Sequence, residues 1–194
     1  LGDVIYPNGL KNEFDTQYFD KFYVPFKPTI NSLNKPIFHI ITGNHDYKQD
    51  EHVWTKLHNK FHYLFSPSLN YVETYHQGKV CFFNVDTTAA EHFHVRRAYK
   101  TFKWLRAQMK GHKNCKVRIA FGHHPYKSSG HHGNASPLTK YFLKYSIIGK
   151  VDAYFAGHEH QLSHEGKVQG TELFISGSFA KSRPLEKKPM FGTS

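Results

Sequence analysis

The sequence predicts one domain of the α/β class, a mixed β-sheet whose strands alternate with helices. The chain has 194 residues and is 39% hydrophobic, which suffices for one sizeable core but is short for two domains. Short apolar runs bounded by glycine or proline alternate with amphipathic segments of helical period. The sequence shows no internal repeat and no linker, so residues 1–194 are interpreted as a single domain.

Apolar periodicity assigns the elements of the first half of the chain. Phe14, Tyr18 and Phe22 recur at helical spacing, and Pro25 and Pro28 are predicted to end that helix. The remaining elements of this half are predicted to be a buried strand over residues 36–41, a polar loop over 42–46, a helix over 51–61, and a hairpin of strands 71–75 and 80–85.

The second half continues the alternation of helices and strands. A helix is predicted over residues 99–109, because Phe102, Leu105 and Met109 share one face. The other predicted elements are a strand over 117–121, a helix over 138–148 closed by Gly149, a strand over 151–156 and a hairpin over 161–176. Residues 181–194 are basic and contain proline, and no element is predicted there.

The amino-acid composition indicates which classes of binding partner are expected. Lys and Arg number 26 against 15 Asp and Glu, a formal net charge of +11 that favours anionic partners such as phosphate esters. No nucleic-acid module accompanies this charge, so no nucleic acid is expected as a partner. The sequence lacks an apolar run long enough to span a membrane. Cys81 and Cys115 lack CxxC spacing, and they either pair or remain buried and reduced.

Side chains that suit metal ions occur in four loops, several of which follow predicted strands. Loops beyond the carboxyl ends of strands converge in open α/β sheets. A carboxylate can bridge two cations, imidazole and amide groups suit Fe²⁺, Zn²⁺ or Mn²⁺, and a phenolate suits ferric iron. Two cations about 3.5–4 Å apart can activate water for phosphoryl displacement. The candidate groups are Asp3 with Tyr6, Asn44-His45-Asp46, His123, and His158 with His160.

Each of these motifs alone is more often an ordinary turn or capped loop, but together they resemble four of the five motif blocks of the metallophosphoesterase (calcineurin-like) superfamily. Tyr6, three residues after Asp3, makes the chain similar to the purple acid phosphatases, particularly the small, tartrate-resistant type. The resemblance covers nearly the whole chain. It implies a sandwich of mixed β-sheets flanked by helices (αββα). The blocks are Gly2-Asp3-Val4-Ile5-Tyr6, Gly43-Asn44-His45-Asp46, Ala120-Phe121-Gly122-His123 and Gly157-His158-Glu159-His160.

The resemblance implies a role for each matched residue. The cofactors would be Fe(III) and a divalent ion, Fe, Zn or Mn, and a metal-held hydroxide would attack a phosphate monoester without a covalent phosphoenzyme. His45 and His132 would contact the substrate phosphate, and one of them would protonate the leaving alkoxide. Asp3 would bridge the metals, Tyr6 and His160 would bind the ferric ion, and Asn44, His123 and His158 would bind the divalent ion.

Two expectations about conditions follow. An imidazole with a pKa near 6.5 is mostly cationic at about pH 5–6, so the two phosphate histidines predict an acidic optimum. Their neighbours His124 and His131 are expected to support the site or to face solvent. Purple acid phosphatases are commonly extracytoplasmic, so the resemblance implies a secreted or otherwise extracytoplasmic protein.

The sequence also departs from the family pattern. The first motif, an Asp-x-Gly that would supply another ferric ligand, has no counterpart, and closing strands after Ser176 are missing. The chain is therefore expected to be an internal piece of a longer phosphatase, incomplete at both ends. Without that aspartate, it is expected to bind the ferric ion weakly and to hydrolyse esters poorly.

Two other functions remain open. One is a divalent-metal phosphodiesterase or protein phosphatase of the wider superfamily, although Tyr6 argues against it because those relatives usually place another residue there. The other is a catalytically impaired relative that binds anionic partners through its basic surface. The retained ligand set argues against the second possibility for the parent protein.

Overall fold

The computed structural model describes residues 1–32, 38–178 and 182–193. Its helical segments are α1 (Thr16–Tyr18), η1 (Phe19–Tyr23), α2 (Val24–Ser32), η2 (Asp46–Lys48), α3 (Val53–His58), α4 (Thr88–Glu91), α5 (Val95–Gly111) and α6 (Pro137–Ser146). Its strands are β1 (Phe38–His39), β2 (Leu64–Phe65), β3 (Tyr71–Tyr75), β4 (Val80–Asn84), β5 (Val117–Phe121), β6 (Ala153–Ala156), β7 (Leu162–Val168), β8 (Thr171–Ser176) and β9 (Phe191–Thr193).

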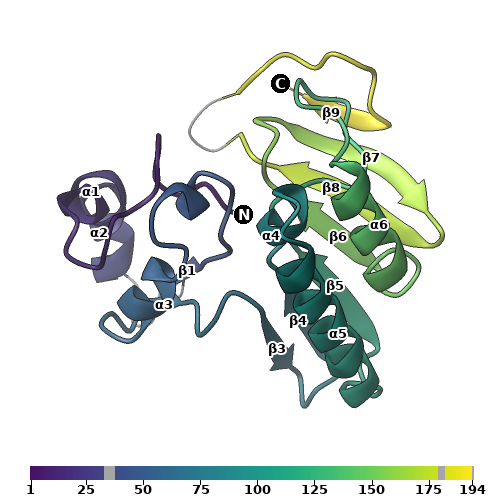
Figure 1. Cartoon of the computed structure of the whole chain (residues 1–194), viewed down its shortest axis with the longest axis horizontal. Helices are drawn as coiled ribbons and strands as arrows, with labels where there is room; N and C mark the ends of the chain where they lie inside the picture. The colour runs from purple at the N-terminus through teal and green to yellow at the C-terminus, as the bar shows by residue number, and fades with distance from the viewer. Residues whose placement is uncertain (33–37, 179–181, 194) are drawn as a thin grey trace.

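The predicted mixed α/β fold is confirmed. Seven strands form one sheet in the order β3-β4-β5-β6-β8-β7-β9, and Figure 1 shows α4, α5 and α6 running along it. Strands β4, β5, β6 and β8 run parallel to one another at the centre of the sheet, whereas β3 pairs antiparallel with β4 on one side, and β7 pairs antiparallel with β8 and β9 on the other. The parallel centre places the carboxyl ends of β4, β5 and β6 at one edge. A second, two-stranded parallel sheet joins β1 and β2.

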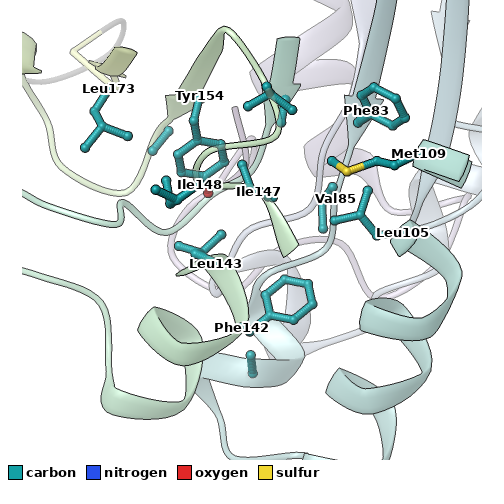
Figure 2. Packing of buried hydrophobic residues seen from close by; sticks show 14 of the residues in the cluster. Phe83, Val85, Leu105, Met109, Phe142, Leu143, Ile147, Ile148, Tyr154 and Leu173 are labelled. Atoms are coloured by element: carbon teal, nitrogen blue, oxygen red, sulfur yellow. The ribbon is translucent and has the colours of Figure 1, made fainter. Parts of the chain in front are cut away.

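The main core lies between the large sheet and helices α4, α5 and α6. Leu105 and Leu143, from α5 and α6, are fully buried against Phe83, Ala120 and Tyr154 of the strands. Figure 2 shows Leu105 and Met109 of α5 and Phe142 and Leu143 of α6 gathered with Phe83, Tyr154 and Leu173 of the strands. Burial of apolar side chains of this size stabilises the fold by about 1.5–3 kcal/mol each, so this layer fixes the strands that carry the site.

A second core supports the N-terminal loops. Trp54 on α3 is 1% exposed and packs edge-on against Tyr18 and Phe22. The hydroxyls of Tyr18 and Tyr63 lie 2.6 Å apart, so the polar ends of these buried rings are satisfied. Ile5 belongs to the same cluster and follows Asp3 by two residues. This aromatic core therefore holds the first ligand loop in place.

The first helix is longer than the sequence predicts. Asp15 caps it by accepting a hydrogen bond from the backbone N–H of Gln17, and helical backbone continues to Ser32 rather than ending at Pro25 and Pro28. The five-residue π-helical segment η1 comes just before Pro25 and widens the turn. Pro25 then falls in the first turn of α2, where a missing N–H is tolerated. Pro28 lies inside α2 and removes one of its hydrogen bonds.

Most other predicted elements are present, several of them shorter than predicted. The strand over 117–121 and the hairpin strands match, whereas the strand over 36–41 is reduced to β1, with residues 36 and 37 outside the described residues. The prediction that residues 181–194 form no element is wrong, because strand β9 pairs with β7. Residue 181 lies outside the described residues. Strand β2 and helix α4, only two and four residues long, were not predicted.

The sheet face opposite α4, α5 and α6 carries a row of aromatic rings. Phe82, Phe121, Phe155 and Phe174 come from four neighbouring strands, and adjacent ring centroids lie 4.8–5.5 Å apart. All four are partly exposed in the described structure. The ring contacts stabilise the strand order across the sheet.

The two cysteines form a disulfide, which decides between the two possibilities that the sequence left open. Cys81 lies on β4, and Cys115 lies just before β5. The bond closes a segment of sequence separation 34 around helices α4 and α5. Such a link disfavours the unfolded chain by limiting its conformations.

Asp86, just after β4, predicts a pH dependence of stability. Its carboxylate is 2% exposed and accepts hydrogen bonds from the Tyr47 hydroxyl and the Thr88 backbone N–H. Burial outweighs these bonds and raises the pKa of Asp86. Between the unfolded pKa of about 3.9 and the raised folded pKa, the folded chain holds more protons, so stability falls as pH rises through that window.

We expect the free energy of unfolding of the wild type, relative to that of Asp86→Asn, to decrease as the pH rises above about 4, the pKa of an unfolded aspartate. Urea unfolding at several pH values measures this difference. Asp20→Asn, at an exposed position on η1, is the matched control. A wild-type-minus-Asp86→Asn difference that stays constant with pH would contradict the assignment.

Candidate metal centre and phosphate site

The four predicted ligand loops meet at one cavity of about 970 Å³. The loops after β5 and β6 bring their histidines from the carboxyl edge of the sheet, and the loops at residues 1–9 and 42–46 come from the N-terminal part. All eight residues predicted for the site line this cavity: Asp3, Tyr6, Asn44, His45, His123, His132, His158 and His160. Their individual roles remain predictions.

Asp3, Tyr6 and His160 form one group of potential ligands. The Tyr6 hydroxyl donates to Asp3 Oδ2 at 3.1 Å, and it lies 3.0 Å from Nε2 of His160. Three different donor atoms, a carboxylate oxygen, a phenol oxygen and an imidazole nitrogen, therefore face one point. This is the set that the sequence predicts for the ferric ion.

Asn44, His123 and His158 form the second group. Oδ1 of Asn44 lies 2.9 Å from His123 Nε2 and 3.1 Å from His158 Nδ1. The two histidine nitrogens lie 3.2 Å apart. Oδ2 of Asp3 is also 3.2 Å from His123 Nε2, so the same carboxylate oxygen belongs to both groups. This placement fits the predicted bridging role of Asp3.

The donor set of the second group fits a cation. Nδ1 of His123 lies 2.8 Å from the Leu1 carbonyl oxygen, which can only accept, so Nδ1 carries a proton. In the neutral ring, Nε2 then presents a lone pair toward the carbonyl oxygen of Asn44 and the carboxylate of Asp3, which also carry lone pairs. A proton on Nε2 can form hydrogen bonds with only one or two of these neighbouring oxygens. A metal ion can accept electron pairs from the nitrogen and from both oxygens.

The pKa shifts of the ligands agree with that fit. Burial opposes ionisation of Asp3, but the hydrogen bond and charge of His123 outweigh it and hold the pKa of Asp3 below its ordinary range. Burial and the neighbouring His123 lower the pKa of His158 to about 3, which leaves its ring neutral and able to ligate. Burial and Asp3 raise the pKa of Tyr6, so a phenolate there requires a cation.

The backbone is strained where two ligands are presented. Asp3 has φ of 53° and His158 has φ of 37°, a left-handed region that such residues rarely adopt. Close packing explains the glycine before Asn44, because a Cβ on Gly43 would lie 2.3 Å from Asp3 Oδ1. Unfavourable backbone angles therefore occur at one ligand from each half of the chain, and Gly43 allows the loops at Asp3 and Asn44 to pack closely.

Asp46 joins these two loops, a role that the sequence analysis did not assign. Its Oδ2 accepts hydrogen bonds from the backbone N–H groups of Asp3 and Gly43, both at 2.9 Å. Its Oδ1 accepts from the indole N–H of Trp54 at 3.3 Å, and Asp46 is 1% exposed. The signal was present in the sequence, since Asp46 closes the second motif, but its partners are distant along the chain.

The two predicted phosphate histidines lie at opposite sides of the ligand groups. His45 stacks near the Tyr6 ring, with centroids 4.3 Å apart, and its Nδ1 donates to the Pro7 carbonyl. The His132 ring lies 4.7 Å from that of His158. Burial and the nearby Arg183 lower the pKa of His132. Both imidazoles can therefore face an oxyanion held between the two loops.

His124 takes the first of the two places expected for it, because it supports the site rather than facing solvent. It is 1% exposed, and its Nδ1 lies 3.0 Å from the Thr87 hydroxyl, which also accepts from the backbone N–H of His123. Its ligand atom lies within 4.8 Å of those of His123 and His158. His124 therefore packs behind the second group, whereas His131 faces outward and pairs with Glu186 at 2.7 Å.

The sheet and the two groups of potential metal ligands that share the Asp3 carboxylate define the class, an α/β domain with a candidate dinuclear metal site. Residues 1–162 match the calcineurin-like phosphoesterase family (Metallophos). The chain belongs to the calcineurin-like phosphoesterase family, and the resemblance drawn from the four motifs is confirmed.

Curated relatives are purple acid phosphatases. Purple acid phosphatase 3 of Arabidopsis thaliana is 30% identical over 93% of this chain and 53% of its own length. Tartrate-resistant acid phosphatase type 5 of Sus scrofa is 25% identical over 96% of this chain and 59% of its own length. The chain thus spans little more than half the length of these relatives.

A solved structure shares the fold. It is described as GAP50, the anchor in the inner membrane complex of Plasmodium, and it superposes with a TM-score of 0.75 and 20% identity. The match covers 98% of this chain and 65% of that one. Among the described residues, no helix is both long and apolar enough to cross a membrane.

Proposed function

We propose that this chain carries the catalytic centre of an acid phosphatase that hydrolyses phosphate monoesters at a dinuclear site of Fe(III) and a divalent ion, Fe, Zn or Mn. One observation carries the proposal. Ligand side chains from four loops meet in one cavity, and Oδ2 of Asp3 lies within 3.2 Å of both Tyr6 and His123, one from each group. The purple acid phosphatase relatives support the reaction class.

The position of each residue in the two ligand groups gives its proposed role. Tyr6 and His160 would hold the ferric ion, Asn44 with His123 and His158 would hold the divalent ion, and Asp3 would bridge the two. When bound, the metals supply Lewis-acid activation of water and of the phosphoryl oxygens. His45 and His132 would orient the phosphate, and one of them would supply a proton to the leaving alkoxide oxygen, with no covalent phosphoenzyme.

Metal analysis combined with a visible spectrum tests this proposal. In the full-length parent protein, which would supply the upstream aspartate, we expect about two metals per chain, hydrolysis of p-nitrophenyl phosphate with an acidic optimum, and a tyrosinate–iron absorption band. Tyr6→Phe should abolish the band because it removes the phenol oxygen, whereas Tyr99→Phe, on the exposed surface of α5, should retain it.

A colourless protein with alkaline, manganese-dependent diesterase activity would contradict the proposal and favour the wider superfamily.

A non-catalytic binding function is the second candidate, and the fold match to a protein described as an anchor gives a reason to test it. The net charge of +11 would then serve anionic partners. A purified protein with neither bound metal nor turnover would favour this candidate. The convergence of the ligand groups argues for the enzyme.

We also propose an extracytoplasmic location. The Cys81–Cys115 disulfide supports it, because disulfides persist mainly in oxidising compartments. Thiol labelling of the protein isolated from its native source should find both cysteines blocked until a reductant is added. Free thiols in the freshly isolated protein would contradict the proposal.

A further inference from the structure

A cationic side chain that no motif supplies lies in the cavity. Arg183 lines it together with His132 and His160. One guanidinium nitrogen, Nη1, lies 2.8 Å from Nε2 of His132, and the backbone N–H of Arg183 donates to the His160 carbonyl at 2.8 Å. The side chain of Arg183 therefore contacts His132, which is predicted to bind phosphate, and its backbone contacts His160, which is predicted to bind a metal.

Residues 182–187, here called the arginine strap, hold Arg183 at this place. The backbone N–H groups of Glu186 and Lys187 donate to the Ser129 carbonyl at 3.1 and 3.0 Å. The Glu186 carboxylate also pairs with His131 at 2.7 Å. These contacts anchor the strap to the loop that carries His132, so both side chains are presented by one connected surface.

The charge of Arg183 is available to an anion. Among the ion pairs between described residues, none involves Arg183. Its contact with His132 occupies one of the five N–H donors of a guanidinium, whose planar fork matches two oxygens of a phosphate. A half-buried, permanently charged fork beside a phosphate site is suited to bind the substrate's anionic group.

We propose that Arg183 is a substrate-binding residue that contacts phosphoryl oxygens alongside His132. This inference rests on the proposed phosphatase function. The arginine would stay charged whatever the protonation state of His132, and it would orient the phosphate from the side of the strap. Arg183 is therefore expected to act on binding of phosphate more than on the chemical step.

Arg183→Ala, Arg183→Lys and Lys187→Ala test the inference. In Arg183→Ala we expect the KM for p-nitrophenyl phosphate and the inhibition constant of inorganic phosphate to rise about tenfold to a hundredfold, as for loss of a charge-assisted hydrogen bond. The kcat should change much less. Arg183→Lys should recover part of the affinity, because it restores the charge without the fork. Lys187→Ala, on the exposed part of the strap, should match the wild type.

Calorimetric titration with inorganic phosphate gives a readout that is independent of turnover, and thermal unfolding checks that each variant is folded. If the wild type hydrolyses the ester and Arg183→Ala binds phosphate normally, the inference is overturned and the phosphatase function stands. If the wild type binds phosphate without turnover, the proposed function fails and the loss of affinity in Arg183→Ala alone supports the inference. Equal losses in Lys187→Ala, or no phosphate binding by the wild type, would overturn it.

Discussion

Replacing Asp3 with asparagine is expected to lower kcat/KM for p-nitrophenyl phosphate by about a thousandfold or more, which corresponds to roughly 4 kcal/mol of transition-state stabilisation. Its Oδ2 faces both Tyr6 and His123, so the substitution removes the negative charge that the two ligand groups share. Bound metal should fall below two per chain. The fold should persist, because the amide oxygen can still accept the hydrogen bond that Asp3 Oδ1 receives from the His45 backbone N–H at 2.7 Å.

Metal content, circular dichroism and turnover measured on the same samples separate these effects. Asp20→Asn removes an equal charge from an exposed position on η1 and should leave both metal content and rate unchanged. Full activity in Asp3→Asn would mean that no bridging carboxylate is needed at this position, and the dinuclear site would have to be abandoned.

The sequence could predict which side chains line the cavity because each motif is local. A glycine, a ligand and a strand end are neighbours in the chain, so the four loops carry their own signal, and the carboxyl-edge rule for parallel strands was enough to bring His123 and His158 together. Strand β5 was predicted at its observed bounds for the same reason, since its apolar run is continuous and ends in glycine.

Contacts made by distant residues could not be predicted in this way. Arg183 lies in a basic segment without periodicity, and its place beside His132 depends on backbone hydrogen bonds to residues 129 and 160. The continuation of the first helix past Pro25 depends on a π-helical turn, which has no clear pattern in the sequence. Strand β9 forms only because β7 offers it an edge.

Asp46 illustrates how a buried carboxylate can link the aromatic core to the metal loops, and it gives the prediction with the largest expected effect on stability. Asp46→Ala leaves the backbone N–H groups of Asp3 and Gly43 and the indole N–H of Trp54 without their acceptor. Each buried unsatisfied group costs about 1–3 kcal/mol. We therefore expect the free energy of unfolding to fall by about 3 kcal/mol or more in Asp46→Ala.

Asp46→Asn should lose less, about 1–2 kcal/mol, because one amide oxygen can still accept the two backbone hydrogen bonds while its NH₂ group faces the Trp54 donor. Urea unfolding with a chelator present measures the effect without a contribution from bound metal. Asp20→Ala at the exposed position is expected to change stability by less than about 0.5 kcal/mol. If Asp46→Ala proved as stable as Asp20→Ala with the chelator present, the Asp46 carboxylate would not be what fixes the loops at Asp3 and Gly43 to the aromatic core, and the linking role assigned to Asp46 would be wrong.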